Sequence, residues 1–342
     1  MKTKIVYVLV SSNNDIYLEQ AYVSMYSVKY YMPDAHITLL TDKLTEATFI
    51  GIRKKEIQYV DELISIEISG NYTASQRSRI LKTSVRKYIK GDFLFIDTDT
   101  IVVRPLYEID NMEADIAACW DTHSPFVSNP YRSMCIEHGK KLGWPIENET
   151  VYYNSGVIFV KDNEQTHKFY ELWNKNWLEG CKKKIYMDQP AFAKTNYMLG
   201  HPAQTLDDIW NCELKHGVKY LKDAKIVHYL CTNISKKNNQ QVFVLNEKDI
   251  LLQIIDNKGE IPSLIKDAIV NPFTGLASVT QLFAGDFLPF FQSNMFGCMY
   301  KLKDSLMFKI LESYVLQAFI SIKKQINKYE KNIFRLLHLC HV

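Results

Sequence analysis

The sequence has few of the residues that mark fibrous, disordered or disulfide-stabilised proteins. Its 13 glycines and 10 prolines among 342 residues are too few for a collagen-like or low-complexity chain. Its seven cysteines are scattered and include no Cys-x-x-Cys pair, which argues against a disulfide framework and a zinc ribbon. With 47% hydrophobic and 23% charged residues, the chain has the composition of a folded globular protein, and we expect its cysteines to be reduced.

An excess of one charge and a long hydrophobic run are also missing. The 41 Lys and Arg residues and the 38 Asp and Glu residues leave a net charge of +3, too small for a dedicated nucleic-acid-binding protein. No apolar run reaches the roughly 18 residues needed to span a bilayer. The apolar run at residues 5–10 is short and no small-x-small cleavage site follows it, which favours a buried strand over a signal peptide. We therefore expect a cytoplasmic protein.

The first hundred residues alternate between strand-like and helix-like patterns. Helical periodicity occupies residues 18–26 and 80–89, and apolar runs of strand length occupy residues 5–10, 36–40, 63–68 and 93–96. Such alternation predicts an α/β fold with a mostly parallel central sheet covered by helices on both faces. Ligands of such sheets bind beyond the carboxyl ends of the strands. The segments 11–17 and 97–99, which follow two of these strands, are therefore expected at a binding site.

Two carboxylates and one histidine are the candidate metal ligands. Asp97 and Asp99 come directly after the buried run 93–96, so both can reach one hard divalent cation. His228 lies near the end of another apolar segment, and one imidazole beside two carboxylates suits Mn²⁺ or, less well, Mg²⁺. Two alternatives stay open at this point: an acidic turn between two strands at 97–99, and a core histidine with a hydrogen-bond partner at 228.

Around these residues the sequence resembles the metal-dependent, retaining glycosyltransferases of family 8, which include glycogenin and bacterial lipopolysaccharide galactosyl- and glucosyltransferases. The resemblance runs over residues 4–232. It consists of six short blocks in the family's order: NDIY at 14–17, FLFIDTDTIVVR at 93–104, CWD at 119–121, YNSGV at 153–157, DQ at 188–189 and IVHY at 226–229. The resemblance implies a GT-A fold, a Rossmann-like sheet that binds a nucleotide sugar.

The resemblance also assigns roles to individual residues. It makes Asp97, Asp99 and His228 the metal ligands, with Mn²⁺ as the expected cation and Mg²⁺ as the alternative. It places three side chains at the reaction centre: Asn154, Asp188 and Gln189. The residues expected to contact the donor are Asn14, Asp15 and Tyr17 for the uracil and ribose, Arg79, Lys82 and Thr98 near the phosphates, and Asp121 at the sugar.

Several of these assignments have a simpler structural alternative. Tyr17 is also placed to pack at a helix start, and Asp188 to cap the helix that follows it. Arg79 and Lys82 lie one helical turn apart, and the sequence does not say which of them serves the donor. After the histidine the family continues with Gly and Lys-Pro-Trp, but residues 230–237 read LCTNISKK. Two alternatives stay open: Lys236 or Lys237 takes the place of that lysine, or the phosphates are held by the metal and by Arg79 or Lys82 alone.

The function implied is transfer of a hexose from a UDP-sugar to an acceptor hydroxyl with retention of the anomeric configuration. The acceptor expected is a glycan or glycolipid, such as a lipopolysaccharide or capsule precursor of a bacterial surface. Two other functions fit an α/β nucleotide-binding plan: a sugar-nucleotide nucleotidyltransferase and a non-catalytic UDP-sugar-binding protein. The first usually has a glycine-rich loop after its first strand, and residues 11–17 contain no glycine.

The C-terminal part of the chain differs from the rest in charge and pattern. We expect a catalytic domain at 1–235 and a helical region at 236–342. Residues 300–342 carry eight Lys and Arg against three Asp and Glu, and apolar residues recur every four positions from 302 to 326, as in a long amphipathic helix. This helix is expected either to rest on the inner face of an anionic membrane or to pack on its own domain or a second subunit. Nucleic-acid binding is not expected.

Overall fold

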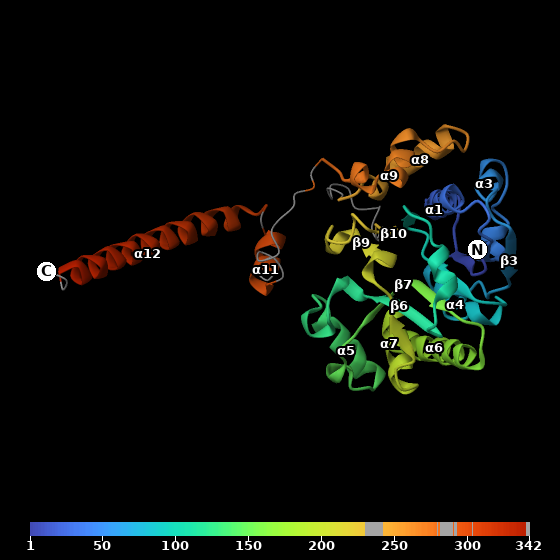
Figure 1. Cartoon of the computed structure of the whole chain (residues 1–342), viewed down its shortest axis with the longest axis horizontal. Coiled ribbons are helices and arrows are strands. Elements are labelled where there is room, and N and C mark those ends of the chain that lie inside the picture. Colours follow the sequence, from blue (N-terminus) through green and yellow to red (C-terminus); the bar gives the residue numbers. More distant parts are fainter. Residues whose placement is uncertain (230–241, 279, 281–289, 291–292, 303, 340–342) are drawn as a thin grey trace. The chain divides into compact units, whose positions relative to one another are not determined.

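The computed structural model describes residues 1–229, 242–278, 280, 290, 293–302 and 304–339. Two compact units divide the chain, Met1–Thr280 and Gln281–Val342. The domain boundary expected at residues 235 and 236 lies outside the described residues. Figure 1 colours both units along the sequence.

The first unit is built on a seven-stranded sheet with the order β3-β2-β1-β4-β7-β6-β8. Parallel pairs join β1 to β2, β2 to β3, β1 to β4 and β6 to β8, whereas β7 runs antiparallel to both β4 and β6. The strands are β1 (Lys4–Leu9), β2 (Ile37–Asp42), β3 (Glu62–Ile66), β4 (Phe93–Ile96), β6 (Ile116–Trp120), β7 (Tyr153–Val160) and β8 (Ala203–Thr205). The predicted α/β fold with a mostly parallel sheet is confirmed.

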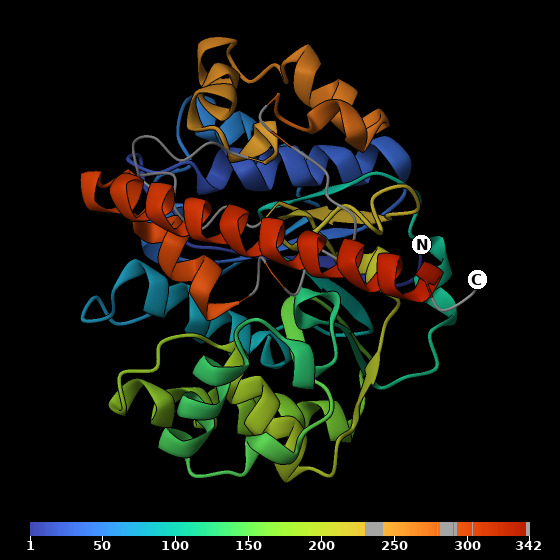
Figure 2. The same ribbon diagram turned by 90° about the vertical axis from the view of Figure 1, so that its left-hand side faces the viewer.

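Helices cover both faces of this sheet because successive residues of each strand point to opposite sides. On one face, Ile5 and Tyr7 of β1 pack in a core with Met25 of α1. On the other face, Val6 packs in a second core with Trp173 of α6. The green and yellow-green helices lie on the opposite side from α1 in Figure 2. The helices are α1 (Tyr17–Tyr31), α4 (Ala74–Thr83), α5 (Arg132–Leu142), α6 (Glu164–Lys182) and α7 (Gln189–Met198).

A second, three-stranded sheet has the order β5-β10-β9. Its strands are β5 (Thr100–Val102), β9 (Cys212–Glu213) and β10 (Ile226–His228). β10 runs antiparallel to β5, and this register sets His228 opposite Thr100. Because Thr100 directly follows the aspartates of the 97–99 segment, this pairing brings the histidine to the carboxyl end of β4.

Two helices from the region expected to be helical after residue 236 complete the first unit. α8 (Lys248–Asp256) and α9 (Ser263–Val270) share a core with α1 and with β10. Figure 1 shows them beside α1. One hydrogen bond across this contact runs from the Tyr22 hydroxyl of α1 to the Gly259 carbonyl oxygen at 2.8 Å. The first unit therefore includes residues 242–278 as well as residues 1–229.

The second unit contains two described helices, α11 (Asn294–Leu302) and α12 (Leu306–Leu339). The periodic pattern expected from residue 302 onward therefore belongs mainly to α12, since Leu302 ends the preceding helix. Within the described residues, every helix is too short or too polar to cross a lipid bilayer.

Candidate active site and family

The three candidate metal ligands lie together at the carboxyl end of β4. One ligand atom each of Asp97, Asp99 and His228 falls within 4.8 Å of the other two. The His228 Nε2 atom is 3.2 Å from an oxygen of Asp99. Asp97 is fixed by its own backbone, whose N–H donates to the Gly156 carbonyl oxygen of β7 at 2.8 Å. Residues far apart in the sequence thus meet because β4, β5 and β10 are adjacent.

The chemistry of this group fits a hard divalent cation. Two carboxylates and one imidazole provide oxygen and nitrogen ligands, the set that Mn²⁺ accepts readily. The side chains of Asp97 and Asp99 are 28% and 18% exposed, whereas that of His228 is 3% exposed. A cation can therefore enter from solvent on the carboxylate side, while the histidine forms the buried wall of the site.

Two basic residues of α4 face the same carboxylates. Lys82 is buried and its Nζ lies 3.0 Å from Asp97 and 3.3 Å from Asp188. Arg79, whose side chain is 36% exposed, places Nε 2.8 Å from Asp188. Burial raises the pKa of Asp97, and Lys82 opposes that rise. Lys82 is therefore committed to the buried carboxylates, and Arg79 is the more accessible of the two cations.

Asp188 begins α7 but does not cap it through its side chain. Its carboxylate instead accepts a hydrogen bond from the Ser155 hydroxyl at 2.8 Å and pairs with Arg79 and Lys82. Burial by itself would raise the pKa of Asp188, but the two cations and this hydrogen bond lower it to about 2. The capping alternative is therefore wrong, and Asp188 is an ionised part of the site.

Asp121, which directly follows β6, accepts hydrogen bonds from three side-chain amides. One oxygen accepts from Gln189 at 2.8 Å and from Asn154 at 3.4 Å. The other oxygen accepts from Asn129 at 2.8 Å. The sequence blocks at 119–121, 153–157 and 188–189 thus converge on one buried carboxylate next to the candidate metal ligands.

The loop after β1 carries the residues expected at the nucleotide. Asp15 accepts hydrogen bonds from the hydroxyls of Ser11 and Ser12, at 2.7 and 2.8 Å, and from the backbone N–H of Tyr17 at 3.1 Å. Asp15 therefore stabilises the conformation of this loop through hydrogen bonds within it. Asn14 is exposed, and Tyr17 is 46% exposed at the start of α1, where its ring is accessible to a base.

Two further candidates complete the comparison with the sequence. Thr98 lies between the two metal-ligand aspartates and is partly exposed. Lys236 lies outside the described residues.

Several residues of the site escaped the sequence analysis. Asn211, Asn129 and Ser155 each hold one of the candidate residues by a hydrogen bond. Asn211 directly precedes β9 and is fully buried. Acidic residues flank it at 207, 208 and 213, so the local sequence carried no signal that this amide is buried.

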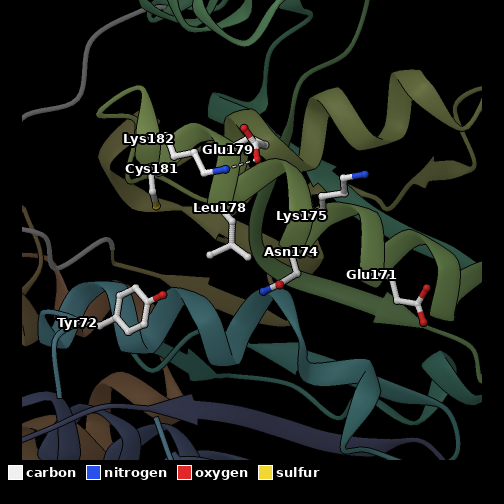
Figure 3. A pocket seen from close by; sticks show the side chains of 8 residues that line it. All are labelled: Tyr72, Glu171, Asn174, Lys175, Leu178, Glu179, Cys181 and Lys182. Atoms are coloured by element: carbon white, nitrogen blue, oxygen red, sulfur yellow. Dashed lines mark hydrogen bonds and ion pairs between the residues drawn. The ribbon is translucent and has the colours of Figure 1, made fainter. Parts of the chain in front are cut away.

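A cavity of about 440 Å³ lies elsewhere, along α6 near Tyr72. Figure 3 shows that its lining alternates in charge, with Lys182 paired to Glu179 at 2.6 Å. None of the candidate site residues lines it.

Comparison with known proteins identifies the family. The sequence profile of a family described as nucleotide-diphospho-sugar transferase matches residues 77–257, more than half of the chain. The chain belongs to this family. No curated protein matches the sequence.

Solved structures with a similar fold are distant in sequence. An active-site mutant of the galactosyltransferase LgtC is 13% identical, with a TM-score of 0.50 over 76% of this chain and 98% of that one. Mouse xyloside xylosyltransferase 1 is 15% identical, with a TM-score of 0.46 over 70% and 100%. The glycosyltransferase GlyE of Streptococcus pneumoniae TIGR4 is 16% identical, with a TM-score of 0.49 over 83% and 67%. The GT-A glycosyltransferase fold implied by the sequence blocks is thereby confirmed, and the donor class is a nucleotide-diphospho-sugar.

Proposed function

We propose that this nucleotide-diphospho-sugar transferase moves a hexose from a UDP-sugar to an acceptor hydroxyl with retention of configuration, as a family 8 enzyme. The observation that carries the proposal is the meeting of Asp97, Asp99 and His228 within 4.8 Å beside the buried Asp121 and Asp188. These three residues would hold Mn²⁺, or Mg²⁺ in its place. The cation supplies stabilisation of the negative charge on the departing diphosphate.

Side chains around the cluster have distinct tasks in this proposal. The exposed ring of Tyr17 stacks on the uracil, and the exposed Asn14 offers it hydrogen bonds. Arg79 binds the diphosphate, since its guanidinium is accessible while Lys82 is enclosed between Asp97 and Asp188. Thr98 and Lys236 are proposed to contribute further contacts to the donor.

The donor sugar is proposed to lie against Asp121, Asn154, Asp188 and Gln189. The oxygens of Asp121 and Asp188 already accept hydrogen bonds or ion pairs from several neighbours. A carboxylate held in this way is a poor covalent nucleophile, which favours attack by the acceptor on the face that the diphosphate leaves. The bond from the anomeric carbon to the diphosphate breaks, the bond to the acceptor oxygen forms, and the acceptor proton passes to a diphosphate oxygen.

The acceptor is proposed to be a lipid-linked or other surface glycan precursor of a bacterial cell, reached at the inner face of the membrane. α12 supports this proposal through its chemistry. Leu311 and Ile322 lie on one face of the helix and are 51% and 52% exposed, whereas Lys309 and Lys323 lie on the other side. A helix with an apolar face and basic flanks suits the surface of an anionic bilayer.

The proposal is tested by measuring UDP release from a panel of UDP-hexoses in the presence of Mn²⁺. We expect one of them to be hydrolysed slowly without acceptor, and Asp99→Ala to lower that rate by about 100-fold or more, because a cation ligand at the leaving group is removed. Asp256→Ala is the matched control, since this aspartate is exposed on α8.

Full activity of Asp99→Ala after removal of divalent cations would contradict the metal site. Binding of UDP-sugar without any UDP release, with or without acceptor extract, would instead indicate a non-catalytic binding protein.

A further inference from the structure

A chain of buried amides connects His228 to the carboxylate of Asp121. The His228 Nδ1 atom is 2.9 Å from the side-chain oxygen of Asn211. The amide nitrogen of Asn211 donates to the side-chain oxygen of Asn154 at 3.1 Å, and Asn154 in turn donates to Asp121 at 3.4 Å. His228, Asn211 and Asn154 are 2%, 0% and 7% exposed, so water does not compete strongly for these contacts.

The backbone N–H of Gly156 determines which group donates and which accepts in each of these side-chain hydrogen bonds. The N–H of Gly156 is only a donor, and it lies 2.7 Å from the Asn154 side chain, which must therefore present its oxygen there. That oxygen is also the group that Asn211 faces, so Asn211 must present its NH₂ to Asn154. The remaining oxygen of Asn211 then faces the ring of His228 and accepts a hydrogen bond from Nδ1–H.

With its proton on Nδ1, the neutral ring of His228 can bind a cation through its other nitrogen, Nε2. With the proton on Nδ1, the Nε2 of a neutral ring is an acceptor, and it lies 3.2 Å from an acceptor oxygen of Asp99. Two acceptors at that distance require either a metal cation beside them or, in the metal-free protein, a second proton on the ring. A metal-ligating histidine ordinarily gains its orientation from such a hydrogen bond at its second nitrogen.

We propose that Asn211 is a positioning residue that fixes His228 with its proton on Nδ1 and its Nε2 toward the metal site. Through Asn154, the same residue ties the orientation of the metal ligand to Asp121, the carboxylate proposed to contact the donor sugar. The inference deepens the proposed function and rests on it for the identity of the ligands. Its first part, the proton position, holds for the metal-free protein as well.

The first measurement is the position of the ring proton in the metal-free full-length protein labelled with ¹⁵N-histidine. We expect the His228 signals, assigned by their loss in His228→Ala, to show a proton on Nδ1. In Asn211→Leu the acceptor is absent, and we expect a mixture that includes the Nε2-protonated ring. A wild-type ring protonated on Nε2 alone, or an unchanged ring in Asn211→Leu, would overturn the proposal.

The second measurement is Mn²⁺ affinity, followed by electron paramagnetic resonance of free Mn²⁺. Asn211→Leu is expected to weaken binding by about 10- to 100-fold, the effect typical of losing the partner of a ligating histidine. Asn211→Asp keeps an acceptor for Nδ1–H but loses the donor to Asn154. It is expected to bind Mn²⁺ within about threefold of wild type while the KM for the UDP-sugar rises.

Asn176→Leu is the matched control for the loss of a buried amide. Asn176 of α6 is 4% exposed and donates to the hydroxyl of Thr195 of α7 at 2.9 Å. It should reduce thermal stability without changing the Mn²⁺ affinity, and an equal loss of affinity in this control would assign the effect to general destabilisation. If wild-type protein binds no Mn²⁺ at all, the proposed function fails, and the Nδ1 proton still decides the role of Asn211.

Discussion

At the scale of single residues, the site is organised by charges that hold one another in place. Lys82 joins Asp97 to Asp188, and Arg79 contacts Asp188 from the exposed side. Because of these two cations, the pKa of the buried Asp188 stays below its ordinary value, although burial by itself would favour protonation. The donor would therefore meet an arranged set of charges, with little rearrangement needed on binding.

Elsewhere one buried carboxylate lacks such a partner. Glu56 is fully buried at the end of the short helix α3 (Ile52–Lys55), and neither of its oxygens has a hydrogen-bond partner among the described residues. Burial and the nearby Glu19 raise the pKa of Glu56 from its ordinary value near 4.5 to about 7, against the opposing charge of Arg53. The folded chain therefore holds a proton here that the unfolded chain releases at lower pH.

This shift predicts a stability that declines with pH. The contribution of Glu56 is complete below pH 4.5 and is lost as the pH rises through 7, because the folded state must then bury a charge. We expect the free energy of unfolding of Glu56→Gln, measured by urea denaturation and compared with wild type, to be ~1–2 kcal/mol more favourable to the folded state at pH 8 than at pH 5. Glu171→Gln, an exposed control on α6, should show no such difference, and equal behaviour of the two variants would contradict the assignment.

Gly156 shows what sequence could and could not say about a residue. The resemblance in the block at 153–157 drew attention to this position, but it did not explain why the residue there is a glycine. A Cβ atom there would lie 2.4 Å from Cε1 of His228 and 2.9 Å from the side-chain oxygen of Asn154. The residue must therefore be small because the ring of a strand about seventy positions later packs on it, a contact that only the tertiary structure creates.

At the scale of elements, the central strands were predictable and the second sheet was not. β1 and β4 are almost entirely apolar runs of strand length, so the hydrophobic pattern alone identified them. β5, β9 and β10 have two or three residues each, too few for a periodic signal. The pairing of β10 with β5 places His228 beside Asp99, and it depends on contacts between distant segments that no local pattern reports.

The helices divide in a similar way. The sequence analysis expected a helix after Asp188, as found in α7, but the role of Asp188 at its start was decided by Arg79 and Lys82 of another helix. α8 and α9 complete the core beside α1, although the sequence analysis placed them outside the catalytic domain. The local sequence pattern therefore predicts that a helix forms, but only the tertiary structure shows which elements its apolar face packs against.

At the scale of the whole molecule, the second unit is where the chain differs most from a bare catalytic domain. α12 has 34 residues, and its large apolar side chains from Leu306 to Ile326, except the partly buried Phe308, are 46% to 76% exposed. An exposed apolar surface of this length needs a partner in water. The basic Lys309 and Lys323 support our proposal that this partner is an anionic bilayer, and the alternatives are the first unit and a second copy of the chain.

Flotation with liposomes tests this partner in the full-length chain. We expect the protein to float with vesicles that contain phosphatidylglycerol and to remain at the bottom with phosphatidylcholine alone. The double variant Leu311→Glu with Ile322→Glu should lose flotation, because it charges the apolar face, whereas Ser313→Glu on the polar face should keep it. Loss of a dimer in the double variant, with no flotation in wild type, would assign the face to a second copy of the chain.

The central claim is that distant side chains share one cation, and it is tested most directly by electron–nuclear double resonance of bound Mn²⁺ with UDP present. With ¹⁵N-histidine labelling, we predict one Mn²⁺ per chain with hyperfine coupling to one histidine nitrogen, and the loss of that coupling in His228→Ala. Bound Mn²⁺ with no nitrogen coupling, or a coupling that survives in His228→Ala, would contradict the account.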